Sequence, residues 1–266
     1  MIQRTRRIVV ALDPAAPRAE AFEALLALCD AADADVTALF IEDDNLLRLA
    51  ALPGAVEIRI QPGAAPHVLD PAAMLAQLER RAEQMRSTCQ RAALDLKLRA
   101  HFSVVRGDVL AELLRAAADA DILVVGRSLR SAGTRTWLGA APERLVAALR
   151  TAGRAPALMF VHEPWHSGRS VALLDDPGEF GARALQLASA LARREGLPLE
   201  HVSLTAGAEG DAGAAGGRDD RMNALRRYCA RQDPRVLVVP MSDTVSDALD
   251  LAALLADLPT SILLSP

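Results

Sequence analysis

The sequence predicts an α/β protein with two doubly wound parallel-sheet domains in tandem, the second of them trimmed. Short, continuous apolar runs alternate with helical segments along the chain, a pattern typical of strands buried on both faces of a parallel sheet. The apolar runs of the first half recur in the second half in the same order. The chain has 266 residues, 51% of them hydrophobic, which suits two domains of about 150 residues or fewer.

The first half is expected to contain five strands joined by helices. The strands are predicted at residues 8–12, 36–41, 96–105, 122–125 and 157–161. The helices are predicted at residues 18–32, 45–51, 70–94, 109–118 and 141–152. Asp70 and Pro71 supply an acidic N-cap and a first-turn proline for the third helix. Residues 53–70 are rich in proline and glycine and are expected to be irregular. This order of elements predicts a five-stranded parallel sheet.

The two domains are expected to span residues 1–163 and 169–266. Between them a segment with proline, tryptophan and glycine interrupts the repeating pattern. The strands of the second half are predicted at residues 171–175, 201–205, 236–239 and 262–264, and its helices at 181–195 and from about 220. Residues 207–217, rich in glycine and alanine, are expected to form a loop where the first half has its third strand. The second domain is therefore predicted to be a shortened copy of the first.

Charge and apolar patterning exclude several classes of partner. The chain has 30 basic and 34 acidic residues, whereas nucleic-acid-binding domains usually carry a basic excess. No apolar run follows the charged N-terminal residues as a secretory signal requires, and none approaches the roughly 18 residues of a membrane span. Nucleic acid and membranes are therefore not expected as partners, and a cytoplasmic location is predicted.

Polar and glycine residues gather where the strands of the first half end. In a doubly wound sheet, ligands bind beyond the carboxyl ends of the strands, where the strand order reverses. Asp13 follows the first strand, and its carboxylate is suited to accept hydrogen bonds from a ribose or an adenine amine. Gly126 ends the fourth strand, where the absent Cβ lets a ligand approach the backbone. Gly139 precedes a helix whose free N–H groups favour a phosphate, and Arg127 lies in the intervening loop.

These residues resemble the pattern of a known family. Residues 7–161 resemble a universal stress protein domain, whose ATP-binding loop follows Gly-x2-Gly-x9-Gly-Ser/Thr. Gly126 and Gly139 match that loop. Leu129 stands where the second glycine is expected and restricts the backbone, and Ala140 lacks the hydroxyl that would bind a phosphate. The resemblance implies the strand order 3-2-1-4-5. It also implies contacts with ATP or another adenine nucleotide at Asp13, Ile41, Gly126, Arg127, Gly139 and Ala140.

The expected function is that of a universal-stress-type protein with a stress-response or regulatory role and no enzyme activity. Adenine-nucleotide binding is expected to be weak or vestigial and confined to the first domain, because Pro240 replaces the loop glycine in the second half and no loop of the family's length fits before Asp247. The alternative is a scaffold that binds no nucleotide and acts through dimerisation or protein–protein contact. The family often dimerises through its last strand, so residues 157–161 and 261–264 are expected to pair within one chain as a pseudo-dimer, unless a homodimer forms instead.

Other motifs are better explained by structure than by chemistry. The string His162-Glu163-Pro164-Trp165-His166 matches a zinc-peptidase motif, but its proline disfavours the continuous helix which that chemistry requires. The acidic residues that follow two strands could bind magnesium, but such carboxylates more often cap turns and helices; these residues are Glu42, Asp43, Asp44, Asp175 and Asp176. The three cysteines lie far apart in predicted helices and are expected to be core residues; they are Cys29, Cys89 and Cys229. Neither a catalytic residue nor a metal ligand is therefore predicted.

Overall fold

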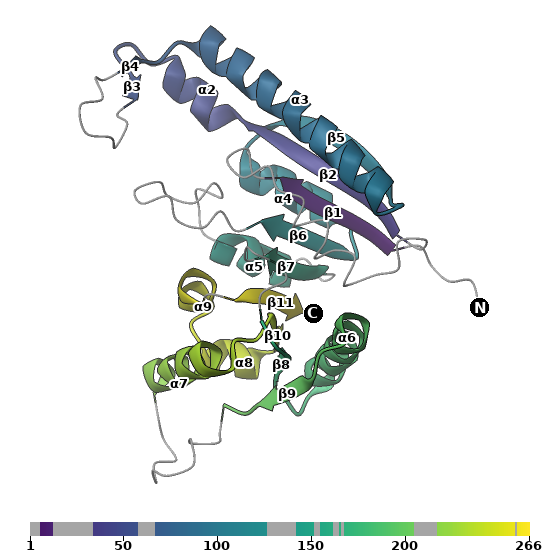
Figure 1. The fold of residues 1–266 in the computed structure, drawn as a ribbon. Helices are drawn as coiled ribbons and strands as arrows, with labels where there is room; N and C mark the ends of the chain where they lie inside the picture. The colour runs from purple at the N-terminus through teal and green to yellow at the C-terminus, as the bar shows by residue number, and fades with distance from the viewer. Residues whose placement is uncertain are drawn as a thin grey trace.

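The computed structural model describes residues 6–12, 34–57, 67–126, 142–151, 155–161, 165, 168–204, 217–258 and 260–266. In these residues one large sheet runs through the molecule (Figure 1). Its strands are β1 (Arg6–Leu12), β2 (Ala34–Asp43), β5 (Arg99–Gly107), β6 (Ile122–Gly126), β7 (Ala157–Val161), β8 (Val171–Leu174), β9 (Leu199–Val202), β10 (Val236–Pro240) and β11 (Ser261–Ser265). A separate antiparallel pair consists of β3 (Val56–Glu57) and β4 (His67–Val68).

Eight helices are described, in positions that largely follow the sequence pattern. They are α2 (Asp44–Ala50), α3 (Pro71–Asp95), α4 (Val109–Ala117), α5 (Pro142–Thr151), α6 (Glu179–Glu195), α7 (Arg218–Gln232), α8 (Asp243–Ala248) and α9 (Leu251–Asp257). The carboxylate of Asp70 caps α3 as predicted, because it accepts hydrogen bonds from the backbone N–H groups of Ala72 at 3.2 Å and Ala73 at 3.1 Å. The helix predicted at residues 18–32 lies outside the described residues.

The strand order of the large sheet is β5-β2-β1-β6-β7-β11-β10-β8-β9. Its first five strands are parallel and give the order 3-2-1-4-5 when numbered within the first half, as predicted. In the second half, β9, β8, β10 and β11 correspond in this order to β2, β1, β6 and β7 of the first half. These four strands are also parallel to one another. Among the described residues β5 has no counterpart in the second half. The domain boundary itself stays a prediction, because one continuous sheet crosses it.

The two halves meet where β7 and β11 pair antiparallel. Ile262 lies opposite Phe160, Leu263 opposite Met159, and Leu264 opposite Leu158. Every residue of both strands is buried. This is the strand pairing that the sequence analysis expected within one chain, and it covers two sheet edges that would otherwise expose unpaired backbone groups.

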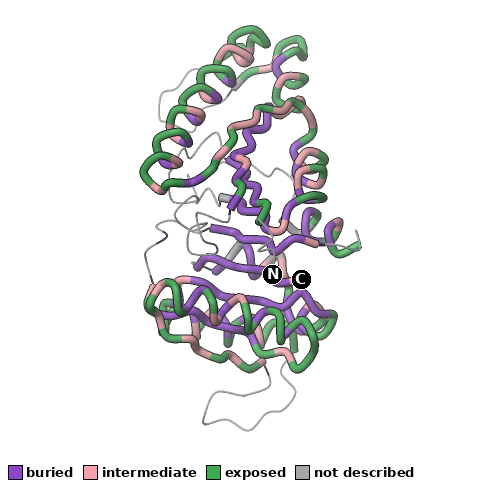
Figure 2. Tube along the Cα trace, turned by 90° about the vertical axis from the view of Figure 1, so that its right-hand side faces the viewer, coloured by how far each residue is buried: buried purple, intermediate pink, exposed green. Residues whose placement is uncertain are grey.

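Two hydrophobic cores lie on opposite faces of this sheet. Alternate residues of each strand point to opposite faces, so that Val10 belongs to one core and Val9 to the other. One core contains the buried sides of α3 and α6, and the other those of α4, α5, α7, α8 and α9. In Figure 2 the strands form the buried interior between these helix layers. The cysteines Cys89 and Cys229 are buried in these cores, as predicted, whereas Cys29 lies outside the described residues.

The segment between the two halves is held tightly at its described residues. Trp165 is 1% exposed and belongs to the core that α3 and α6 cover. Gly168 has φ +103°, and an added Cβ would lie 2.4 Å from the backbone nitrogen of Arg235. The backbone N–H of Arg169 donates to the carbonyl of Asp233 at 2.8 Å, and that of Arg235 donates to the carbonyl of Ser170 at 2.8 Å. The chain therefore enters the second half along the turn that precedes β10. The other residues of the zinc-peptidase-like string lie outside the described residues.

Candidate functional site

The carboxyl ends of β1 and β6 lie side by side at the edge where the sequence predicts a ligand. Ala11 of β1 pairs with Val125 of β6, and Gly126 is the last residue of β6. β1 also pairs with β2, so the strand order reverses between β1 and β6. The sheet thus brings Gly126 next to the end of β1, which Asp13 directly follows in sequence.

The six predicted nucleotide contacts stay predictions, and only Ile41 and Gly126 lie among the described residues. Asp13, Arg127, Gly139 and Ala140 lie outside the described residues, so their roles stay predictions. Ile41 is in β2, where it is 1% exposed and belongs to the core that α4 and α5 cover. In this structure its side chain therefore contributes to the hydrophobic core directly below the candidate edge.

Next to this edge, the ends of β2 and β5 are joined by an ion pair. Glu42 lies opposite Arg106 in the strand pairing, and its carboxylate accepts hydrogen bonds from Arg106 Nε at 2.9 Å and Nη2 at 2.7 Å. Glu42 is only 6% exposed, whereas the side chain of Arg106 is half exposed. The hydrogen bond and charge of Glu42 raise the pKa of Arg106 above its ordinary value. Both hydrogen bonds from this arginine go to one oxygen of the buried carboxylate, Oε2.

The other acidic residues at this edge cap helices. Asp43 accepts a hydrogen bond from the backbone N–H of Asn45 at 2.8 Å and caps α2. Asp108 accepts one from the backbone N–H of Ala111 at 2.9 Å and caps α4. In the described part of the chain, no group of three or more histidine, cysteine, aspartate or glutamate side chains is placed to hold a metal ion. Capping thus accounts for Asp43 and Asp108.

The corresponding edge of the second half is closed by a helix. Pro240 ends β10 opposite Ser265, in the position that Gly126 has at the end of β6 opposite Val161. Only Met241 and Ser242 separate Pro240 from α8, and the Ser242 hydroxyl accepts a hydrogen bond from the backbone N–H of Val245 at 3.1 Å. This short connection agrees with the prediction that no phosphate loop fits before Asp247.

Asp175, which follows β8 as Asp13 follows β1, already has a side-chain partner. Its Oδ1 lies 2.8 Å from Nδ1 of His201, and its backbone N–H donates to the carbonyl of Val202 at 2.9 Å. The neighbouring Asp176 packs against α6, where a Cβ at Gly181 would lie 1.8 Å from the Asp176 carbonyl oxygen. The second acidic pair is thus part of the turn that leads into α6.

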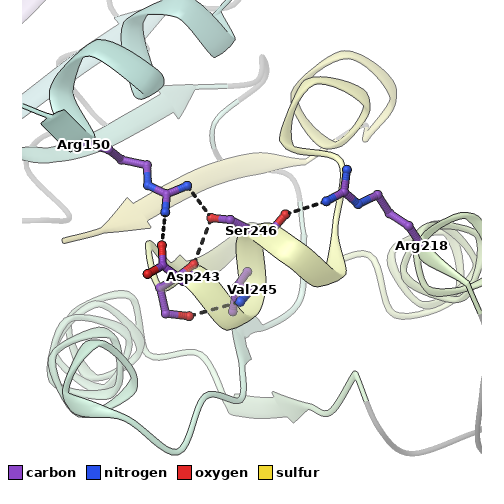
Figure 3. Close-up of polar contacts among 6 residues, drawn as sticks. Arg150, Arg218, Asp243, Val245 and Ser246 are labelled. Carbon is purple, nitrogen blue, oxygen red and sulfur yellow. Dashed lines mark hydrogen bonds and ion pairs between the residues drawn. The ribbon is translucent and has the colours of Figure 1, made fainter.

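A polar cluster that the sequence analysis did not identify joins the halves at α8 (Figure 3). Arg150 of α5 donates from Nη1 to the Ser246 hydroxyl at 2.7 Å and forms an ion pair with Asp243. Arg218 of α7 donates from Nη2 to the carbonyl oxygen of Ser246 at 3.0 Å and to that of Asp247 at 3.2 Å. The serine at the start of α8 is a local N-cap signal, but nothing local links Arg150 to residues more than ninety positions away.

Solved structures with the same architecture include a universal stress protein. The crystal structure of a universal stress protein from Archaeoglobus fulgidus DSM 4304 matches with a TM-score of 0.59 and 10% identity, covering 99% of this chain and 97% of that chain. A functionally unknown protein from Pseudomonas aeruginosa PAO1 matches with a TM-score of 0.54 and 14% identity, covering 99% and 93%. No family model and no curated protein sequence matches the chain.

At this low identity the likeness concerns the fold. The chain has the doubly wound α/β fold of universal stress proteins, which confirms the predicted fold class and, at the level of the fold, the predicted resemblance. None of the described helices combines the length and apolar character needed to cross a membrane.

Proposed function

We propose that this chain is a universal-stress-type protein whose first half binds ATP or another adenine nucleotide weakly, in a stress-response or regulatory role. The observation that carries the proposal is the position of β1, which lies between β2 and β6. The reversal of strand order between β1 and β6 is the place where doubly wound sheets bind ligands. Gly126 ends β6 there without a Cβ, and Asp13 follows β1.

The contrast between the halves supports assigning the nucleotide to the first half alone. Fifteen residues, 127–141, separate β6 from α5, whereas the equivalent connection from β10 to α9 has ten residues, 241–250, six of which form α8. Proline replaces glycine at the end of β10, and Asp175 is occupied by His201. The second edge therefore offers neither a glycine at the strand end nor an aspartate without a side-chain partner.

The proposed role is binding without a chemical step. Burial raises the pKa of Cys89 and of Cys229 to about 12, so both thiols stay protonated at neutral pH and are poor nucleophiles. Each described carboxylate at the candidate edge has a partner. Glu42 pairs with Arg106 and Asp44 with Arg48, while Asp43 and Asp108 cap helices. We therefore expect bound ATP to be recovered intact, and steady phosphate release that Asp13→Ala abolishes would contradict this part of the proposal.

Calorimetry and thermal unfolding with ATP, ADP, AMP and cyclic AMP test the proposal. Binding to the folded state stabilises it as the logarithm of ligand concentration, by about 2.7 kcal/mol at a hundredfold excess over Kd. We expect this stabilisation in the natural chain and in Asp175→Ala, and its loss in Asp13→Ala. Asp175→Ala is the matched control, because it removes the aspartate at the equivalent position of the second half. Unfolding temperatures that do not change up to millimolar nucleotide would refute nucleotide binding.

A second candidate function is a scaffold that acts through protein contact. An apolar patch favours it: five large aliphatic side chains on or beside α2 and the β3–β4 pair are each more than 40% exposed, and these are Leu46, Leu49, Leu52, Val56 and Val68. Exposed apolar patches on monomers often mark interaction surfaces. Concentration-dependent sedimentation that Leu49→Glu abolishes, together with no response to any nucleotide, would favour the scaffold.

A further inference from the structure

Helix α5 connects the proposed nucleotide edge of the first half with the second half. It begins at Pro142, directly after the segment that contains Gly139 and Ala140, and it ends at Thr151, one residue after Arg150. Because β7 and β11 are antiparallel, the carboxyl edge of the second half lies on the same side as the amino edge of the first half. Helix α8, which follows the carboxyl end of β10, therefore meets Arg150 at the C-terminal end of α5 (Figure 3).

We infer that Arg150 is a positioning residue through which the second half sets the placement of α5 and thereby the nucleotide affinity of the first half. This inference rests on the proposed function and on the expectation that the N-terminal end of α5, which follows Gly139 in sequence, lies at the nucleotide's phosphates. Helix α8 stands where a phosphate loop would follow β10, and it holds Arg150. In the second half, the region that corresponds to residues 127–141 of the first half thus includes α8, and α8 contacts the first half through Arg150.

The contacts hold α8 from both sides. Arg150 reaches the Ser246 hydroxyl at 2.7 Å and the carboxylate of Asp243, while the Ser246 hydroxyl donates to the carbonyl of Ser242 at 2.9 Å. On the far side Arg218, at the start of α7, donates to the carbonyls of Ser246 and Asp247 at the end of α8. Helix α8 is therefore fixed within the second half and offers Arg150 a stationary partner.

Helix α5 is short and packed along one side, so a contact at its C-terminal end affects the position of its N-terminal end. Its ten residues make a rod of about 15 Å. Leu145, Val146 and Leu149 are buried along one side, and the helix packs against α4 of the first half and α9 of the second. Since packed helices shift as bodies more easily than they bend, releasing the C-terminal end changes the position of the first turn.

The size of the effect follows from exposure. The side chain of Asp243 is 93% exposed and that of Arg150 33%, so the ion pair belongs to the weak, solvent-screened class. We expect Arg150→Ala to weaken ATP binding about two- to fivefold at low salt. The difference should shrink at 1 M salt, where the screening length is about 3 Å.

The experiment measures ATP affinity by calorimetry and, without nucleotide, amide hydrogen exchange in peptides covering residues 142–146, in which the Val146 N–H is the amide that the first turn of the helix protects. Arg150→Ala should weaken binding and speed exchange of that amide, about one turn from the substitution. The exchanged pair Arg150→Asp with Asp243→Arg restores the ion pair and should recover much of both. Arg183→Ala is the matched control, since Arg183 forms an exposed ion pair with Glu179 inside α6 only. Ser246→Ala removes one of the contacts and replaces Arg150→Ala if that variant does not fold.

The outcomes separate this inference from the proposed function. Unchanged affinity and unchanged exchange at residues 142–146 in folded Arg150→Ala would overturn the inference, and so would equal effects from Arg183→Ala. If the natural chain binds no nucleotide, the proposed function fails and the inferred control of affinity fails with it. Faster exchange at 142–146 in Arg150→Ala would then still show that the second half positions α5.

Discussion

Gly168→Ala should destabilise the protein more than its small size suggests, because the segment between the halves passes closely over the start of β10. Gly168 has φ +103°, a conformation that L side chains rarely adopt. Its new Cβ would lie 2.4 Å from the backbone nitrogen and 2.5 Å from the Cα of Arg235, which are backbone atoms that cannot rotate away.

The magnitude can be worked from two contributions. Holding alanine in a sparsely populated backbone region costs about 1–3 kcal/mol. To relieve the overlap the segment must shift, which weakens the hydrogen bonds from Arg169 to Asp233 and from Arg235 to Ser170, both 2.8 Å. Each such bond contributes about 0.5–1.5 kcal/mol, so we expect Gly168→Ala to lower the free energy of unfolding by about 2–6 kcal/mol.

Urea unfolding followed by far-ultraviolet circular dichroism measures this loss. The matched control is Gly196→Ala at the end of α6, where φ is +64° and nothing lies within 4 Å of the added Cβ. That variant carries the backbone cost alone, about 1 kcal/mol. Equal losses in the two variants would refute the argument that the contact with Arg235, rather than the backbone angle, dominates at Gly168.

Three further predictions concern the cores. Leu263→Ala in β11, a fully buried residue opposite Met159, should cost about 2–5 kcal/mol in urea unfolding, whereas exposed Leu52→Ala should change stability by no more than about 0.5 kcal/mol; similar losses would show that the joint between the halves is loosely packed. Trp165→Ala should cost about 3–5 kcal/mol, because a large side chain leaves the core, and a loss below 1 kcal/mol would show that this segment is not anchored there. Cys89 and Cys229, with pKa values raised to about 12 by burial, should resist iodoacetamide at pH 8, where only about one thiol in 10,000 is ionised. Because the pKa is raised, labelling of the native protein should increase with pH. Peptide mass spectrometry checks this, and rapid labelling of the native protein at pH 8 would contradict it.

Local patterns in the sequence predicted most of the strands and helices. The runs at β7 and β10 are short, apolar and bounded by turn residues, and the structure places strands there. The boundaries of β5 shifted, because Lys97 adopts φ 53° in the turn after α3 and delays the strand to Arg99. Helices α8 and α9 were not predicted, since each has only six or seven residues and too few turns for a periodic apolar pattern.

For the candidate site, the sequence could indicate which residues end the strands, but not how their side chains are engaged. Gly126 was predicted at the end of β6 and lies there. The burial of Ile41 and the pairing of Glu42 with Arg106 depend on which strand becomes the neighbour of β2. Strand neighbours are set by contacts distant in sequence, which residue periodicity does not specify.

The sequence by itself determined that this chain forms strands buried on both faces, in an order repeated along two halves, because apolar runs and turn residues act over a few positions. Only the tertiary structure decided that β7 and β11 run antiparallel. Because of this direction, the carboxyl edge of the second half lies on the same side of the sheet as the C-terminal end of α5. The contact of Arg150 with Asp243 and Ser246 exists for that reason. Two buried apolar strands can pair in either direction with equal local preference, so the choice belongs to the packing of the whole sheet.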